Sequence, residues 1–286
     1  MKKPSAVNIK IYEQQMKFLL VQKEIINMAN YHLNVCNKSR GKGESFIREI
    51  SYITGKTLHD NYYNTTWYNY KDNVLYWEII LPDDSPPNFD DIQNLCYEID
   101  KAETRKDART ARVIVGSLPN ELPLKEQIMI VEEFVKKNFT TFGLGAIVAI
   151  HEGKNERKPS KNNPHVHIVI TTRSIDSNGF CHKKDRNWND RKYVTIWREQ
   201  WAEIQNKAYK RNHIKAEVSP YSLNVQGYKR KALPHLSFSD YQKEKRGIHT
   251  IAGDERRKIK KHNKKLNKKQ KKEKHRNKDI DHEIEM

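Results

Sequence analysis

The alternation of apolar and polar residues predicts several β-strands. The clearest case is residues 165–173 (HVHIVITTR), in which Val166, Ile168 and Ile170 are separated by single residues. Strand side chains point to opposite faces at every second position, so these three share one face and His165 and His167 share the other. Four further runs have strand character, at residues 28–38, 74–82, 110–119 and 143–153.

Helical spacing occurs between these runs. Residues 44–54 place Phe46, Ile50 and Ile53 on one side of a short helix that stops at Gly55. Three longer stretches also have helical character, at residues 89–108, 124–139 and 191–212. Strands and helices are interspersed and many loops are short, which favours an α+β fold with a mostly antiparallel central sheet flanked by helices.

The chain divides into three parts by composition. Residues 1–27 form an amphipathic N-terminal extension without a chemical motif, and residues 28–253 carry the strands and helices of the folded domain. Residues 254–286 are a lysine-rich, low-complexity tail, expected to be disordered or a lone helix.

The charge balance points to a polyanion. The 286 residues contain 54 lysines and arginines against 36 acidic residues, which gives a formal net charge of +18. About seven of these charges lie in the tail, so the folded part is strongly basic as well. Nucleic acid is the expected partner, because neutralising phosphates releases counterions; the alternative is a basic protein without a specific ligand.

Cysteine usage and hydropathy suggest a cytoplasmic protein. Cys36, Cys96 and Cys181 are scattered, which argues against a disulfide framework and against a cysteine-type zinc site. The start MKK resembles that of a signal peptide, but Glu13, Gln14, Gln15 and Lys17 interrupt any apolar stretch. We therefore expect neither secretion nor membrane insertion.

Three histidines form the first candidate site. His151 ends one predicted strand, and His165 and His167 begin the next. In a hairpin these positions face one another, so the imidazoles can hold a divalent metal and leave positions open for substrate. The alternative is a group of surface histidines beside the long loop 152–164.

Tyr52 is the candidate nucleophile. The chain has no GxSxG motif and no phosphate-binding GxxxxGK[ST] loop, but Tyr52 lies on the short helix after the basic glycine loop SRGKG. The alternative role of Tyr52 is core packing. The aromatic residues Tyr62, Tyr63 and Trp67 could stack on unpaired bases or simply pack a loop.

Several motifs in order resemble one family. They are YHLNVCNKSRGKGESFIREISYITGKTLHD, RKDARTARVIVGSLPNEL, NPHVHIVITTR with the upstream AIH, NGFCHKKDRNWND followed by WREQWAEIQNKA, and SLNVQGYKRKALPHL. Together these motifs, across roughly residues 29–253, resemble the MobA/MobL-type relaxases of mobilisable plasmids, which belong to the HUH endonuclease group. Met28 places Tyr52 about where that family has its tyrosine relative to the start.

The resemblance implies a nickase for single-stranded DNA at a plasmid origin of transfer. Tyr52 matches the nucleophile that forms a 5′-phosphotyrosine and later allows religation, and His151, His165 and His167 match the metal ligands. The metal expected is Mg²⁺ or Mn²⁺, with Zn²⁺ as an alternative. Further partners would be accessory mobilisation proteins and a conjugative coupling protein. Residues assigned to DNA contact are Arg173, Arg105, Arg112 and Lys42.

One departure from the family pattern concerns activation of the tyrosine. Some members carry an acidic residue just before the LP of the second motif, where this chain has Val113 and Val115. Glu103 or Asp107, slightly upstream, could replace it. Two alternatives stay open: another HUH protein, such as a replication initiator or transposase, and a metal-containing DNA-binding protein without catalysis.

Overall fold

The computed structural model describes residues 27–70, 72–154, 162–234 and 236–284. The chain forms two compact units, the first ending at Pro220 and the second comprising Tyr221–Met286. The boundary that the sequence suggests at residue 253 lies within the second unit and remains a prediction. Residues 1–26, most of the expected N-terminal extension, lie outside the described residues.

The first unit is built on an antiparallel sheet. Its strand order is β2-β6-β8-β7-β5, and a short β9 pairs with β8. The strands are β2 (Leu33–Ser39), β5 (Val74–Ile80), β6 (Arg109–Ser117), β7 (Leu144–His151), β8 (His165–Asp176) and β9 (Gly179–Phe180). Every neighbouring pair in this sheet is antiparallel, which confirms the expected fold class.

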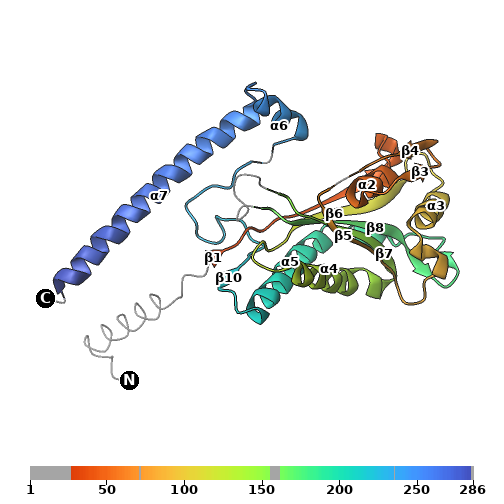
Figure 1. The fold of residues 1–286 in the computed structure, drawn as a ribbon, viewed down its shortest axis with the longest axis horizontal. Coiled ribbons are helices and arrows are strands. Elements are labelled where there is room, and N and C mark those ends of the chain that lie inside the picture. Colours follow the sequence, from red (N-terminus) through yellow and green to blue (C-terminus); the bar gives the residue numbers. More distant parts are fainter. Residues whose placement is uncertain (1–26, 71, 155–161, 235, 285–286) are drawn as a thin grey trace, which may run out of the picture. The chain divides into compact units, whose positions relative to one another are not determined.

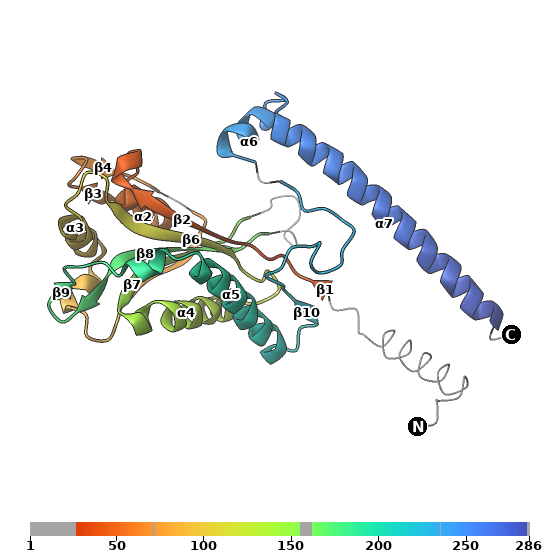
Figure 2. The same cartoon turned by 180° about the vertical axis from the view of Figure 1, so that it is seen from behind.

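Helices cover both faces of the sheet (Figures 1 and 2). One face carries α4 (Leu124–Asn138) and α5 (Lys192–Arg211), and the other carries α2 (Phe46–Thr54) and α3 (Ile92–Ala102). Smaller elements complete the unit. They are the parallel pair β1 (Asn27–Met28) and β10 (Ala216–Glu217), the hairpin of β3 (Leu58–Asp60) and β4 (Thr65–Trp67), and 3-10 turns at Arg40–Lys42, Pro87–Asp90, Thr140–Phe142 and Arg186–Asn189.

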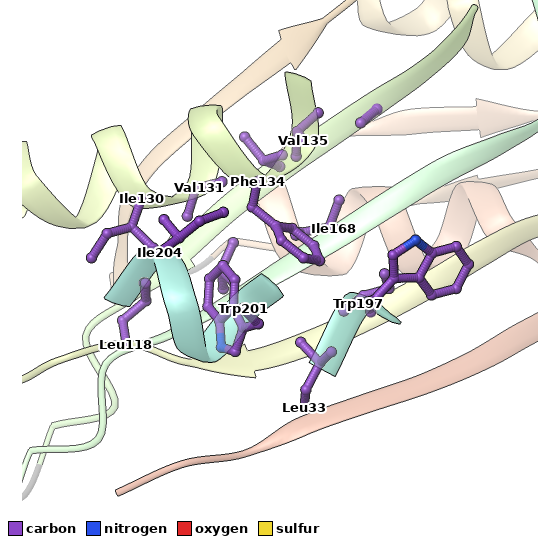
Figure 3. Packing of buried hydrophobic residues seen from close by; sticks show 14 of the residues in the cluster. Leu33, Leu118, Ile130, Val131, Phe134, Val135, Ile168, Trp197, Trp201 and Ile204 are labelled. Atoms are coloured by element: carbon purple, nitrogen blue, oxygen red, sulfur yellow. The ribbon is translucent and has the colours of Figure 1, made fainter. Parts of the chain in front are cut away.

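The larger core lies between the sheet and helices α4 and α5 (Figure 3). Ile168 of the central strand is fully buried there, as are Phe134 and Trp201, whose rings meet edge to face at 5.0 Å. A Cβ at Gly116 would come within 2.9 Å of the Trp201 indole, so glycine is required for this close approach. Burial of each large side chain stabilises the fold by about 1.5–3 kcal/mol, so this layer fixes the position of β8.

The second core lies on the face that carries the histidines. Val169 of β8 and Ile147 of β7 are buried against Ile50 and Ile53 of α2 and Leu95 of α3. Helices α2 and α3 thus pack on the sheet face that carries the histidines. The histidines therefore lie at one end of a covered sheet.

The second unit contains α6 (Phe238–Lys245) and α7 (Ile251–Ile284), joined by a turn in which Gly247 has a left-handed φ of 80°. Residues 254–284 of the lysine-rich tail lie within α7. Within the described residues, no helix combines the length and apolarity needed to cross a membrane.

Candidate functional site

Three histidines converge at the end of the hairpin formed by β7 and β8. His151 pairs directly with His165, and His167 follows two residues later on the same face. The ring centroids lie 4.8–5.4 Å apart, and one donor atom from each residue lies within 4.8 Å of the others. The hairpin rule thus accounts for their proximity, although 13 residues lie between His151 and His165 in the chain.

Backbone carbonyls fix which imidazole nitrogens carry protons. The Nδ1 of His165 lies 2.8 Å from the carbonyl oxygen of Asn163, and the Nε2 of His151 lies 2.7 Å from that of Ile53. A carbonyl oxygen only accepts, so these two nitrogens carry the hydrogens. His165 then has its lone pair on Nε2 and His151 has its lone pair on Nδ1, as in metal sites whose ligands are oriented by outer hydrogen bonds.

The donor set fits a divalent metal. Neutral imidazoles bind such ions at about 2.0–2.1 Å, so two nitrogens on one metal lie at most about 4.2 Å apart. The three donors need to approach one another only slightly to meet this limit. His151 is buried at 2% exposure, while His165 and His167 are half-buried, so three protein ligands leave open positions toward solvent.

Helix α2 presents Tyr52 on the side opposite its buried face. Ser45 caps the helix by accepting a hydrogen bond from the Arg48 amide, and Gly55 ends it with a φ of 71°. Ile50 and Ile53 are fully buried, whereas Tyr52 is 46% exposed. Core packing therefore does not explain the position of Tyr52.

A pocket of about 560 Å³ lies beside Tyr52. Its lining includes Arg48 and Trp67, and the guanidinium of Arg48 lies 5.0 Å from the centroid of the Trp67 ring. Lys38 and Glu49 form an ion pair of 2.9 Å at its wall. The pocket thus joins a cation and an aromatic face next to an exposed phenol.

The hairpin β3–β4 holds the tyrosine helix in place. Ser51 is fully buried and donates to the carbonyl oxygen of Lys56 at 2.7 Å, while Asn69 donates to the Ser51 hydroxyl at 2.8 Å. Asp60, 2% exposed, accepts hydrogen bonds from Ser45 and from the Trp67 indole. Analysis of the sequence missed Ser51 and Asp60, because periodicity does not distinguish a buried polar residue from a surface one.

The two valines of the second motif lie next to the histidines. Val115 pairs with His167 across the β6–β8 ladder, and Val113 pairs with Val169 two residues further along. Residues directly opposite in such a ladder have Cβ atoms about 4.5–5.5 Å apart. A carboxylate at position 115 would therefore lie beside His167, and the valine here leaves that neighbour apolar.

The proposed substitutes for the missing acid lie elsewhere. Glu103 is buried at the end of α3 and pairs with Arg173 at 2.9 Å and with Lys184 at 2.6 Å. Arg173 is six residues beyond His167, which is roughly 20 Å along the strand. Asp107 is exposed and pairs with Arg105 at 2.9 Å. The structure does not bring Glu103 or Asp107 to the histidines.

The structure places the residues assigned to DNA contact at two different sites. Lys42 is exposed on the turn before α2, beside Gly43 of the Tyr52 pocket. Arg173, Arg105 and Arg112 instead line a second pocket at the other end of the sheet. Arg112 faces α5, where its guanidinium lies 5.3 Å from the centroid of the Trp197 ring.

Fold and site together define a mixed α/β domain with a three-histidine centre at the tyrosine helix. Residues 44–246, well over half of the chain, match the model of the MobA/MobL family, so the chain belongs to this family. The sequence-based recognition is confirmed.

Several relatives share this family's names. A "Probable mobilization protein MobA" of Bifidobacterium longum is 36% identical over 162 residues, covering 56% of this chain and 28% of the relative. "Mobilization protein A" of Escherichia coli is 28% identical over 249 residues, covering 79% of this chain and 32% of the relative. The chain therefore spans less than a third of either relative's length.

A solved structure is also similar. It is described as "Molecular Basis of Vancomycin Resistance Transfer in Staphylococcus aureus" and is 28% identical in sequence, with a TM-score of 0.61. The similarity covers 68% of this chain and all of that chain. The region shared with this chain therefore corresponds to the whole of that solved chain.

Proposed function

We propose that this protein is a plasmid mobilisation relaxase that nicks single-stranded DNA at an origin of transfer. The observation that carries the proposal is the hydrogen bond between His151 and the carbonyl of Ile53, the residue after Tyr52. This hydrogen bond connects the candidate metal centre to α2, the helix that carries the exposed Tyr52. Membership of the MobA/MobL family and the names of the relatives support the same conclusion.

The reaction is a transesterification at phosphorus. The Tyr52 oxygen forms a bond to the scissile phosphorus as the phenol loses its proton, and the bond to the 3′ oxygen breaks. The products are a 5′-phosphotyrosine and a 3′-hydroxyl, which takes up a proton. Because the covalent link conserves the phosphodiester, the strand is rejoined by the reverse reaction without ATP.

His151, His165 and His167 would hold the divalent metal in this proposal. When bound, such an ion polarises the scissile phosphate and neutralises the charge that develops on it. Mg²⁺ or Mn²⁺ is the proposed ion. Zn²⁺ is the alternative, which three imidazole donors favour over oxygen-preferring ions.

The pocket beside Tyr52 supports a single-stranded substrate. Trp67 and Tyr63 offer aromatic faces and Arg48 offers a cation, the combination that binds unpaired bases and backbone in proteins for single strands. Strand selection then follows from access, because a paired backbone is too stiff to enter such a site.

Other partners follow from the same role. We propose that the basic residues of the tail bind DNA without sequence preference, and that accessory mobilisation proteins and a coupling protein act with this chain in the cytoplasm. Residues 28–253 would form the relaxase domain, between the N-terminal extension and the tail.

A DNA-binding protein without catalysis is the second candidate, because Val113 and Val115 stand where some relatives carry an acid. Product analysis separates the two. A relaxase leaves a 3′ end that a terminal transferase extends and a 5′ end that resists phosphorylation even after the protein is digested, because the tyrosine remnant still blocks the 5′ phosphate. Tight binding without any new strand end would instead identify the non-catalytic protein.

A further inference from the structure

A second, strongly basic pocket lies at the end of the sheet away from the histidines. Its volume is about 790 Å³, and it is bounded by the start of β6, the end of β8 and the loop before α5. Seven cations line it: Arg105, Arg109, Arg112, Arg173, Lys183, Lys184 and Arg186. We call this site the basic pocket.

Only part of this positive charge is balanced within the protein. Glu103 pairs with both Arg173 and Lys184, so one carboxylate serves two cations. The other two acidic residues of the lining have different roles: Asp107 pairs with Arg105, and Asp185 accepts a hydrogen bond from the Asn187 amide. The basic pocket therefore keeps a net positive charge.

Arg112 is the most unusual of these cations. Its residue is only 6% exposed, and its guanidinium donates to the carbonyl oxygen of Trp188 at 2.8 Å. In the described part of the chain, no carboxylate forms an ion pair with it, and burial, together with the nearby charge of Arg109, holds its pKa below the ordinary value. A buried cation without an anionic partner is costly, and an external anion would relieve that cost.

We propose that the basic pocket binds a backbone phosphate of the DNA, remote from the cut position, and so anchors the strand that Tyr52 cleaves. The proposal rests on the proposed function, because it takes DNA as the ligand. Along β8 the distance from His167 to Arg173 is roughly 20 Å, about six steps of a stacked strand that rises 3.4 Å per nucleotide. Because α2 and α3 cover the sheet between the two sites, a bound strand passes around them and needs more than about six nucleotides to reach both.

Salt-dependent binding tests this anchor. We would measure fluorescence anisotropy of a labelled origin strand of about 30 nucleotides between about 50 and 200 mM NaCl. All proteins would carry Tyr52→Phe, so that binding is read without cleavage. The variants are Arg109→Gln, at an exposed position that tolerates substitution, and Arg112→Gln; the matched control is Lys210→Gln, exposed on α5 outside the pocket.

Loss of one phosphate contact should weaken binding about tenfold and lower the slope of log affinity against log salt by about one. Lys210→Gln should match the parent. A strand of about six nucleotides centred on the cut should not distinguish the variants, because it is too short to reach the pocket. Equal affinities and slopes on the long strand, or equal losses on both strands, would overturn the proposal.

Two further outcomes separate related explanations. If a free nucleoside triphosphate or inorganic phosphate raises the melting temperature through Arg112 while DNA affinity is unchanged in the variants, the pocket serves small anions and not DNA. If the protein with Tyr52 intact forms no covalent adduct on the origin strand, but the salt slope still falls in Arg109→Gln, the proposed nicking function fails while the DNA anchor stands.

Discussion

The Nε2 of His151 lies 2.7 Å from the carbonyl oxygen of Ile53, so the buried histidine of the triad is hydrogen-bonded to the backbone of the tyrosine helix. This contact ties the candidate metal centre to the position of Tyr52. It also gives His151 a structural role that the half-buried His165 does not share.

Replacing His151 should therefore affect both metal binding and folding. His151→Ala leaves the Ile53 carbonyl without its donor, which costs roughly 1–3 kcal/mol of unfolding free energy. His165→Ala removes a half-buried ring and should cost less than about 1 kcal/mol. Urea unfolding measures the difference, and titration with Mn²⁺ should show weak binding in both variants. Equal stability of the two proteins would contradict the assigned contact.

A carboxylate restored at position 115 should strengthen the metal centre. Val115 is directly opposite His167, so Val115→Glu places an acceptor beside this imidazole, and such outer partners typically change metal affinity about 10–100-fold. We expect Mn²⁺ to bind at least about tenfold more tightly in Val115→Glu. Calorimetric titration measures this change.

Position 113 provides the comparison for that experiment. Val113 is 2% exposed and faces Val169, so Val113→Glu buries a carboxylate among apolar side chains. It should destabilise the fold by several kcal/mol without improving metal binding. If both substitutions increase the Mn²⁺ affinity equally, the effect comes from net charge, and the position of residue 115 opposite His167 does not explain it.

Glu103 should contribute to stability and not to the chemistry at Tyr52. Glu103→Gln leaves Arg173 and Lys184 without their shared carboxylate, which should lower the unfolding free energy by roughly 3 kcal/mol. The exposed pair Arg105–Asp107 is the control, because Asp107→Asn should cost less than about 1 kcal/mol. Chemical denaturation of both variants and the parent measures the two losses of unfolding free energy. Equal losses would show that the burial of Glu103 does not strengthen its ion pairs.

Acid should loosen the turn between α6 and α7. Hydrogen bonds from Arg257 lower the pKa of the Glu244 carboxyl from 4.5 to about 2, and this carboxylate also accepts from the Thr250 amide at 2.7 Å. Because the folded pKa is depressed, the stabilisation is complete above pH 4.5 and is lost as the pH falls toward 2. The Thr250 amide resonance should titrate near the lower value. A midpoint near 4.5 would show that the contact is absent in solution.

Local patterns predicted much of this fold. The period-two alternation in residues 165–173 placed β8 correctly, and the spacing of Phe46, Ile50 and Ile53 identified the buried side of α2. The convergence of His151 with His165 also followed from the sequence, because adjacent antiparallel strands joined by a loop bring the end of one beside the start of the next.

Long-range packing could not be predicted in the same way. The second core, in which α2 and α3 cover the histidine face, depends on contacts between residues far apart in the chain, such as Ile53 and Ile147. Glu103 was misplaced for the same reason, since its distance from Val113 in sequence does not reveal that β6 runs away from it toward the histidines. The roles of Asp60 and Arg112 depend on burial, which a charged residue in a sequence does not reveal.

The formation of a covalent DNA adduct tests the central claim most directly. The protein would be incubated with single-stranded origin DNA and Mg²⁺ or Mn²⁺, then boiled in detergent and separated on a denaturing gel. Tyr63→Phe is the matched control, because Tyr63 lines the same pocket as Tyr52. We predict a shifted protein–DNA band for the parent and for Tyr63→Phe, and none for Tyr52→Phe or after addition of EDTA. An adduct that survives in Tyr52→Phe, or its absence from the parent with every divalent metal while DNA still binds, would contradict the account.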